Sequence, residues 1–288
     1  MLEVRRILFP VDFSERCSAA ASHVAAVAKK FHAKVTLLHV IRTPRVWYGD
    51  LPPEELQALI DIRELIKDRQ VTLNACLQDE FRDVADIERI VERGEPARVI
   101  AEHARKDRAH LIMMPTHGYG PFRRMLLGSI TAKVLHDAEC PVWTDVHDEI
   151  SFARLGCQSV ICAVDLREEM VSAIQWAAAF AASFGADLTL VHAIPALAGP
   201  ARPSETRFRS YLVESAREYI ADLQQRAGTA AAVCIQGGRI AQAVRTAAVQ
   251  SAAELVVIGQ GCIHETLGRL RSNAYAIIRE SPCPVVRV

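Results

Sequence analysis

The sequence predicts an α/β protein of two tandem, doubly wound domains, each built on a five-stranded, mainly parallel sheet. Two observations support this prediction. Segments of the first half of the chain recur in the same order in the second half. Within each copy, short apolar runs alternate with longer amphipathic stretches in the order β-α-β-α-β-α-β-α-β. Continuous apolar runs suit strands that helices cover on both faces, as in a parallel sheet.

The internal repeat can be followed residue by residue. Both copies keep the same order of segments, and the second copy is shorter in its middle. The recurring segments are ILFPVD and VICAVD (7–12 and 160–165), TLLHV and TLVHA (36–40 and 189–193), AHLIMMP and AELVVIG (109–115 and 253–259), and ECPVW and PCPVV (139–143 and 282–286). The expected domains are therefore residues 1–147 and 156–288, joined by a linker within His147–Gln158.

Four amphipathic stretches of the first copy are expected to form helices. Ser14 is a candidate N-cap for the first of them, and Pro52 and Pro53 mark the start of the second. Parallel strands joined by such helices form an open sheet, which binds ligands outside the strand C-termini where the strand order reverses. The expected helices are Ser14–Phe31, Glu54–Leu77, Glu95–Lys106 and Ser129–Ala138.

The amino-acid composition limits the classes of binding partner and the cellular compartments that are expected. Lys+Arg and Asp+Glu balance at 34 each, which gives no sign of nucleic acid or an acidic membrane surface as a partner. The N-terminal segment lacks secretory-signal features and no apolar run reaches the roughly 18 residues of a membrane helix, so a cytoplasmic location is expected. No C-x-x-C pair occurs, and we expect free thiols and no metal site.

A glycine-containing loop follows the fourth expected strand of the first copy, in the run MPTHGYGPFRRMLLGSIT. Gly118 and Gly128 lie within it, and Ser129 opens the next helix. Glycines let the backbone approach a ligand closely, and the N–H groups of a helix start attract phosphate. Asp12 ends the first strand at the same sheet edge and could accept hydrogen bonds from a base amine or ribose hydroxyls. The spacing alone leaves open that these glycines are only turn and cap residues.

These residues resemble the signature of the universal stress protein family, G-x2-G-x9-G-[S/T]. The first strand ending in V-D, the second ending in H-V and the final C-P-V strand match as well, and the resemblance spans both copies. It implies a tandem member of the family in which each domain has strand order 3-2-1-4-5. Some members bind ATP at the signature loop and others do not. The implied cofactor is ATP, with or without Mg²⁺.

The resemblance also implies which residues would bind the nucleotide. One pair would flank the adenine and ribose, a second pair would line the base or ribose side, and six residues would hold the phosphates. In that order they are Asp12 and Val40; Met114 and Pro115; and Thr116, His117, Gly118, Gly128, Ser129 and Ile130. Pro115 departs from the signature, which has glycine there. Because proline lacks an N–H, a donor is lost if this position contacts the ligand.

The second copy departs further from the signature. Arg271 replaces the glycine that precedes Ser272, and Cys262 stands in the place of Gly118. Side chains at these positions would crowd the backbone around a phosphate, although an arginine could also contact phosphates itself. The second copy is therefore expected to bind nucleotide weakly or not at all.

Three functions follow as hypotheses. The first is an ATP-binding regulatory stress-response protein that acts on an unidentified protein partner, with nucleotide in the N-terminal domain. The second is an interaction protein without nucleotide, and the third is a slow ATPase. No catalytic residue is assigned, because neither a positioned metal nor a general base is found in the sequence. The resemblance further implies that the edges Pro141–Val146 and Pro284–Val288 pair within one chain, giving a pseudo-dimer; a homodimer stays open.

Overall fold

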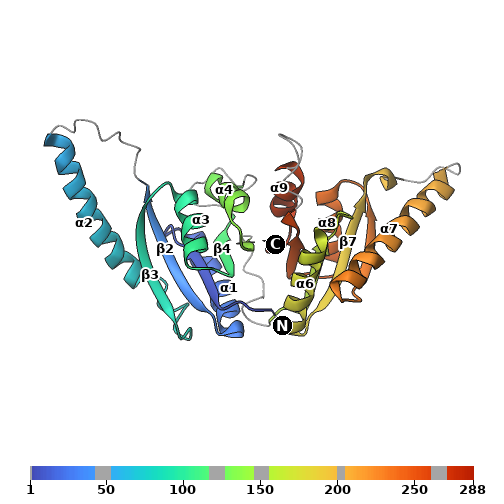
Figure 1. Ribbon diagram of the computed structural model, residues 1–288, viewed down its shortest axis with the longest axis horizontal. Helices are drawn as coiled ribbons and strands as arrows, with labels where there is room; N and C mark the ends of the chain where they lie inside the picture. The colour runs from blue at the N-terminus through green and yellow to red at the C-terminus, as the bar shows by residue number, and fades with distance from the viewer. Residues whose placement is uncertain (1, 43–52, 117–126, 146–155, 200–204, 261–270) are drawn as a thin grey trace. The chain divides into compact units, whose positions relative to one another are not determined.

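The computed structural model describes residues 2–42, 53–116, 127–145, 156–199, 205–260 and 271–288 (Figure 1). Within this part of the chain the contacts define two compact units. One comes mainly from residues 3–142 and the other mainly from Trp143–Val288. The two units are considered one at a time.

The first unit contains a parallel sheet in the strand order β3-β2-β1-β4. The backbone N–H of Ile112 in β4 donates to the carbonyl of Pro141 at 2.9 Å, so the chain just before β5 (Val142–Asp145) continues the sheet beyond β4. The order agrees with the predicted doubly wound topology. The strands are β1 (Arg6–Pro10), β2 (Lys34–Arg42), β3 (Ile87–Gly94) and β4 (Leu111–Pro115).

The second unit repeats this order as β8-β7-β6-β9-β10, and all the described pairs among these five strands are parallel. Strand β5 follows β10 in the sheet, and the hydroxyl of Thr144 donates to the Val285 carbonyl at 3.0 Å. The α/β class and the two tandem domains are confirmed. The strands are β5 (Val142–Asp145), β6 (Ser159–Ala163), β7 (Asp187–Ile194), β8 (Ala232–Gly237), β9 (Leu255–Ile258) and β10 (Val285–Arg287).

Helices alternate with the strands and pack against the sheets. In the first unit α3 contacts α4, and in the second unit α6 contacts α7 while α8 contacts α9 (Figure 1). The four helices expected in the first copy are present within two residues of their predicted ends. The helices are α1 (Glu15–Phe31), α2 (Pro53–Ala75), α3 (Pro96–Lys106), α4 (Ser129–Asp137), α6 (Met170–Phe184), the 3₁₀ turn η1 (Pro195–Leu197), α7 (Thr206–Ala227), α8 (Ile240–Gln250) and α9 (Arg271–Glu280).

Side-chain caps explain two of the helix starts. Ser14 has an extended backbone, and its hydroxyl accepts the N–H of Cys17 at 3.3 Å, as the sequence predicts for an N-cap. Glu95 caps α3 in the same way by accepting the N–H of Arg98 at 3.0 Å, and Pro96 occupies the first helical position. Each cap satisfies a backbone donor that the helix itself leaves unpaired.

The alanine-rich helix α6 packs around aromatic rings in the core of the second unit. Its residues Ala173, Ala177 and Phe180 are completely buried. The ring of Phe180 lies 6.0 Å from that of Trp143 in β5, centroid to centroid. The small side chains of α6 thus leave room for large aromatic rings. The alanine-rich segment is a helix buried in the core of the second unit. Among the described helices, none is long and apolar enough to cross a membrane.

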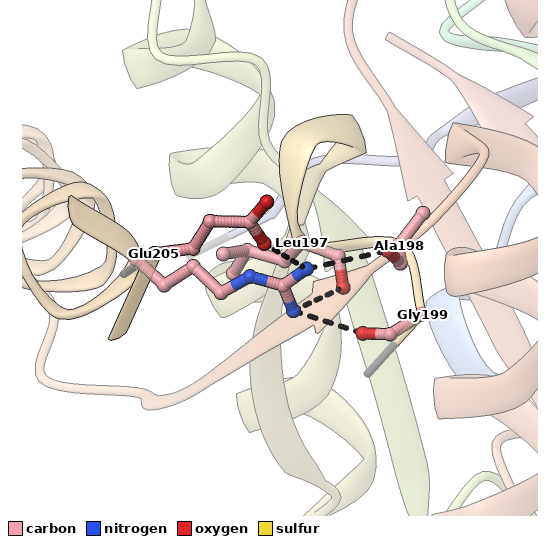
Figure 2. Close-up of polar contacts among 5 residues, drawn as sticks. Leu197, Ala198, Gly199 and Glu205 are labelled. Carbon is pink, nitrogen blue, oxygen red and sulfur yellow. Dashed lines mark hydrogen bonds and ion pairs between the residues drawn. The ribbon is translucent and has the colours of Figure 1, made fainter. Parts of the chain in front are cut away.

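The segment after β7 is fixed by Arg209 from α7 (Figure 2). The Arg209 guanidinium donates to the carbonyl of Gly199 at 2.8 Å, reaches the carbonyls of Leu197 and Ala198 at 3.5 Å, and pairs with Glu205 at 3.4 Å. One planar side chain with several donors thereby satisfies consecutive carbonyls of a turn.

Gly237, the last residue of β8, lies directly against this turn. A β-carbon at Gly237 would come within 2.5 Å of the Leu197 carbonyl oxygen. We expect Gly237→Ala to destabilise the protein by about 1–3 kcal/mol, because a backbone atom must move to admit the methyl group. Urea unfolding would measure the loss. In an Arg209→Met background the turn can shift, so the same substitution should cost less; equal costs in both backgrounds would contradict this coupling.

Candidate functional site

The carboxyl ends of β1, β2 and β4 meet at one edge of the first sheet. Pro10 in β1 pairs with Leu38 in β2, and Leu8 pairs with Ile112 in β4. Continuing this register past the strand ends brings Asp12 level with Val40 and with Thr116. The topology therefore places at one edge three residues that are far apart in the sequence.

The Asp12 carboxylate is held by a tight turn after β1. Its Oδ1 accepts hydrogen bonds from the backbone N–H of Ser14 at 3.0 Å and from the Ser14 hydroxyl at 2.6 Å. Phe13, between them, has a φ of 61°, a left-handed conformation that is uncommon for a residue with a side chain. Leu166 at the equivalent place in the second repeat has a φ of 59°. Both repeats thus keep a left-handed residue after the aspartate, and in the first repeat the hydrogen bonds of this turn orient the carboxylate.

His39 supports the same turn from β2. Its Nδ1 lies 2.7 Å from the Val11 carbonyl oxygen, and its ring lies 4.4 Å from that of Phe13. His192 makes the equivalent contact with Val164, also at 2.7 Å. Because a carbonyl oxygen only accepts, Nδ1 of each histidine donates. These contacts give the two equivalent histidines a structural role.

Half-burial lowers the pKa of His39 below its ordinary value of 6.5, and Arg69 lowers it further, against the opposing effects of the Val11 carbonyl and Asp12. The folded state therefore favours the neutral ring. We expect the packing of the neutral His39 ring to contribute fully to the free energy of unfolding above about pH 6.5. This contribution should be lost as the pH falls towards the pKa of His39 in the folded state. Urea midpoints measured between pH 5 and 8 should depend less steeply on pH in His39→Gln than in the wild type. An unchanged slope in His39→Gln would contradict the assignment.

Hydrogen bonds join the two ends of the predicted phosphate loop. The N–H of Gly128 donates to the carbonyl of Thr116 at 2.9 Å, and the hydroxyl of Thr131 donates to that of Pro115 at 3.2 Å. Helix α4 starts at Ser129 with no side-chain cap. Its first N–H groups therefore lie at the sheet edge that carries Asp12, where the helix dipole favours an anion.

The remaining predicted site residues differ in exposure. Met114, Pro115 and Thr116 are buried, whereas Ile130 in the first turn of α4 is 40% exposed. His117 and Gly118 lie outside the described residues, as do Arg123 and Arg124 of the same loop. The described part of the site thus consists of the β1, β2 and β4 ends and the start of α4.

A comparison of the repeats suggests why proline fits at position 115. Gly259 holds this place in the second repeat, where a β-carbon would come within 2.5 Å of the Met170 sulfur. The first repeat has Cys17 in the position of Met170. In the first repeat, the smaller Cys17 on α1 thus occurs together with the larger Pro115 at the end of β4. The Cys17 thiol is buried, and this burial, reinforced by nearby Asp12, raises its pKa far above the ordinary value, so it is a packing residue rather than a nucleophile.

The equivalent edge of the second unit has a partly open cavity of about 220 Å³. Asp165 and His192, the counterparts of Asp12 and His39, line it together with residues of α8 and α9. The sequence does not reveal this cavity directly, because its clearest feature in this repeat is the altered loop. The repeated V-D and H-A pairs were the available signal, since Val164, Asp165, His192 and Ala193 line the cavity. Within the described ranges no group of three potential metal-ligating side chains comes together.

Comparison with known proteins assigns both repeats to one family. The Universal stress protein family matches the chain twice, over residues 3–145 and 157–288. The chain belongs to the universal stress protein family. Both of its Usp matches contain the strand ends described above, so the tandem architecture inferred from the repeat is confirmed.

Several proteins that are named universal stress proteins are similar to this chain. Universal stress protein MJ0531 of Methanocaldococcus jannaschii is 34% identical over 139 residues, covering 48% of this chain and 79% of that protein. A universal stress protein structure from Archaeoglobus fulgidus shares the fold over 99% of this chain and 96% of its own, at 19% identity and a TM-score of 0.65. A universal stress protein in complex with cAMP is 20% identical and covers 49% of this chain and 95% of its own, with a TM-score of 0.33.

Proposed function

We propose that this universal stress protein is a regulatory stress-response protein that binds an adenine nucleotide, ATP with or without Mg²⁺, in its N-terminal domain. The observation that carries the proposal is the start of α4. The N-cap of this helix is Gly128, and no side chain caps the helix start. The hydrogen bond from Gly128 to Thr116 holds the helix start beside the end of β4. Unpaired N–H groups at a helix start bind phosphate oxygens without any cationic side chain.

The rest of the edge supports a ligand with a polar body next to the phosphates. Asp12 offers a carboxylate whose Oδ1 is fixed by Ser14, and Val40 lies level with it on β2. An oriented carboxylate suits ribose hydroxyls or a base amine, which are hydrogen-bond donors. The choice of adenine among the bases comes from the family resemblance.

Regulation rather than turnover is the activity we assign. Across the described residues the site offers one carboxylate and no metal-ligating cluster, which is less than phosphoryl transfer requires. The nucleotide would change the affinity for a protein partner, in the cytoplasm, and each chain would act as a pseudo-dimer of its two domains.

Calorimetric titration of MgATP into the full chain tests the proposal. We expect one site per chain. Asp12→Ala should raise the dissociation constant about tenfold or more, since a hydrogen bond to a charged group is lost. The matched change in the second repeat, Asp165→Ala, should leave it within about twofold. Absence of heat at millimolar MgATP, with no nucleotide carried through purification, would leave the interaction-only function. Turnover abolished by Asp12→Ala while binding survives would favour the ATPase.

A further inference from the structure

We propose that the cavity of the second unit binds a small zwitterion with an aliphatic body, of the size of a branched-chain amino acid. The site is separate from the proposed nucleotide site and does not depend on it. Its volume of about 220 Å³ is below the 300–1,000 Å³ of typical drug-sized ligand pockets, which fits a small ligand.

The walls of the cavity are aliphatic. Strand β7 contributes Val191 and Ala193, helix α8 contributes Ile240 and Val244, and α9 contributes Ile277. No Phe, Tyr or Trp ring lies among the described lining residues, and His192 supplies the aromatic ring that is found there. The branched side chains of the cavity can pack against the methyl groups of an aliphatic ligand. Such a ligand would gain about 25 cal/mol for each Å² of apolar surface that it buries.

A pair of opposite charges sits beside these walls. The Nε atom of Arg167 lies 3.7 Å from Oδ2 of Asp165, an ion pair too long to be a hydrogen bond. Both side chains are about one-third exposed, at 35% and 29%. The first repeat differs here, because Ser14 stands in the place of Arg167 and hydrogen-bonds to Asp12 at 2.6 Å. The second repeat thus has a cation beside the aspartate at this position, where the first has the uncharged Ser14.

Each end of a zwitterion finds a matching group. An ammonium has three donors, and the Asp165 carboxylate that lines the cavity is an acceptor for it. A carboxylate would face Arg167 and the start of α8, where Ile240 is both the first helical residue and a lining residue. That helix start has no side-chain cap and favours negative charge. Asn273 can donate to or accept from either end.

Methyl NMR on the full chain with labelled isoleucine and valine tests the assignment, with L-leucine as the probe. We expect saturable shifts of the methyl groups of Ile240, Val244 and Ile277. Asp165→Asn and Arg167→Gln should each raise the dissociation constant about tenfold or more, because each removes a charged hydrogen-bond partner. The matched first-repeat change, Asp12→Asn, should alter it by less than about twofold.

Two leucine analogues separate the charges of the probe. 4-Methylpentanoate lacks the ammonium and 3-methylbutylamine lacks the carboxylate, and both should bind at least about tenfold more weakly than leucine. Three results would overturn the proposal. They are no shift at about 10 mM leucine, equal binding of leucine and both analogues, or shifts of the same methyl groups by adenosine or ATP at lower concentrations than leucine.

Discussion

Aspartate in place of Gly128 is expected to lower the affinity for MgATP by about 100-fold or more without destabilising the protein. Gly128 is the N-cap of α4 and has φ −60° and ψ 142°, an ordinary extended conformation that any residue adopts. Aspartate is among the best N-cap residues and would bind the first N–H groups of the helix. It would therefore take the donors that the phosphates need, and its charge would repel them.

The size of this effect follows from the charge. Two unit charges about 4 Å apart near a protein surface interact by up to about 4 kcal/mol, and 2.7 kcal/mol already corresponds to about 100-fold. Gly128→Asn is the matched control, since it has the same shape and caps the helix without charge. We expect its affinity to stay within about tenfold of the wild type, as measured by calorimetry.

Thermal unfolding separates binding from folding in these variants. Both should melt at or slightly above the wild-type temperature, because an Asp or Asn cap is worth a few tenths of a kcal/mol more than glycine. If MgATP binds the aspartate variant as tightly as the wild type, the α4 N-terminus is not the phosphate site. If both variants lose binding and melt early, glycine is needed there for packing.

Alanine in place of Trp143 is expected to cost about 3–5 kcal/mol of stability, the largest loss predicted for a single side chain here. Trp143 is completely buried, and its ring lies 6.0 Å from that of Phe180 in α6. Removal of the indole would leave a cavity that the rigid strand β5 and helix α6 cannot fill by collapse.

The matched control is Trp176→Ala. Trp176 stacks on the same ring of Phe180 at 5.1 Å but is only partly buried, so its loss should cost less. Urea unfolding gives the two free energies. Hydrogen exchange locates the damage, which should appear in α6 and β10, because the contacts of Trp143 belong to the second unit. Protection lost only in β1 and β2 would contradict this placement.

The placement of β5 shows one limit of prediction from sequence. By its C-P-V motif β5 is the last strand of the first repeat, and the expected domain ends at residue 147. Contacts group Trp143–Asp145 with the second unit instead. The motif specifies a buried strand, but which core it completes depends on Phe180 and Val285, which are distant in the chain. The domain limits 1–147 and 156–288 stay predictions.

The candidate site shows the same division. The edge that gathers Asp12, Val40 and Thr116 could be predicted, because parallel strands in a doubly wound order must end together. The hydrogen bonds of Asp12 to Ser14, and of Gly128 to Thr116, could not be read from the motif. They depend on backbone angles such as the left-handed φ of Phe13.

The sequence by itself determined the tandem repeat, the alternation of strands and helices, and the helix starts at Ser14 and Pro53. These features depend on the periodicity of apolar residues and on caps, which involve neighbours a few residues apart. Only the tertiary structure decided that Gly259 lies against Met170, that β5 packs with the second unit, and that the second repeat has a cavity beside an Asp165–Arg167 pair. Packing joins residues across the whole chain, and one sequence carries no local signal of which distant side chains will fill a space or leave it open.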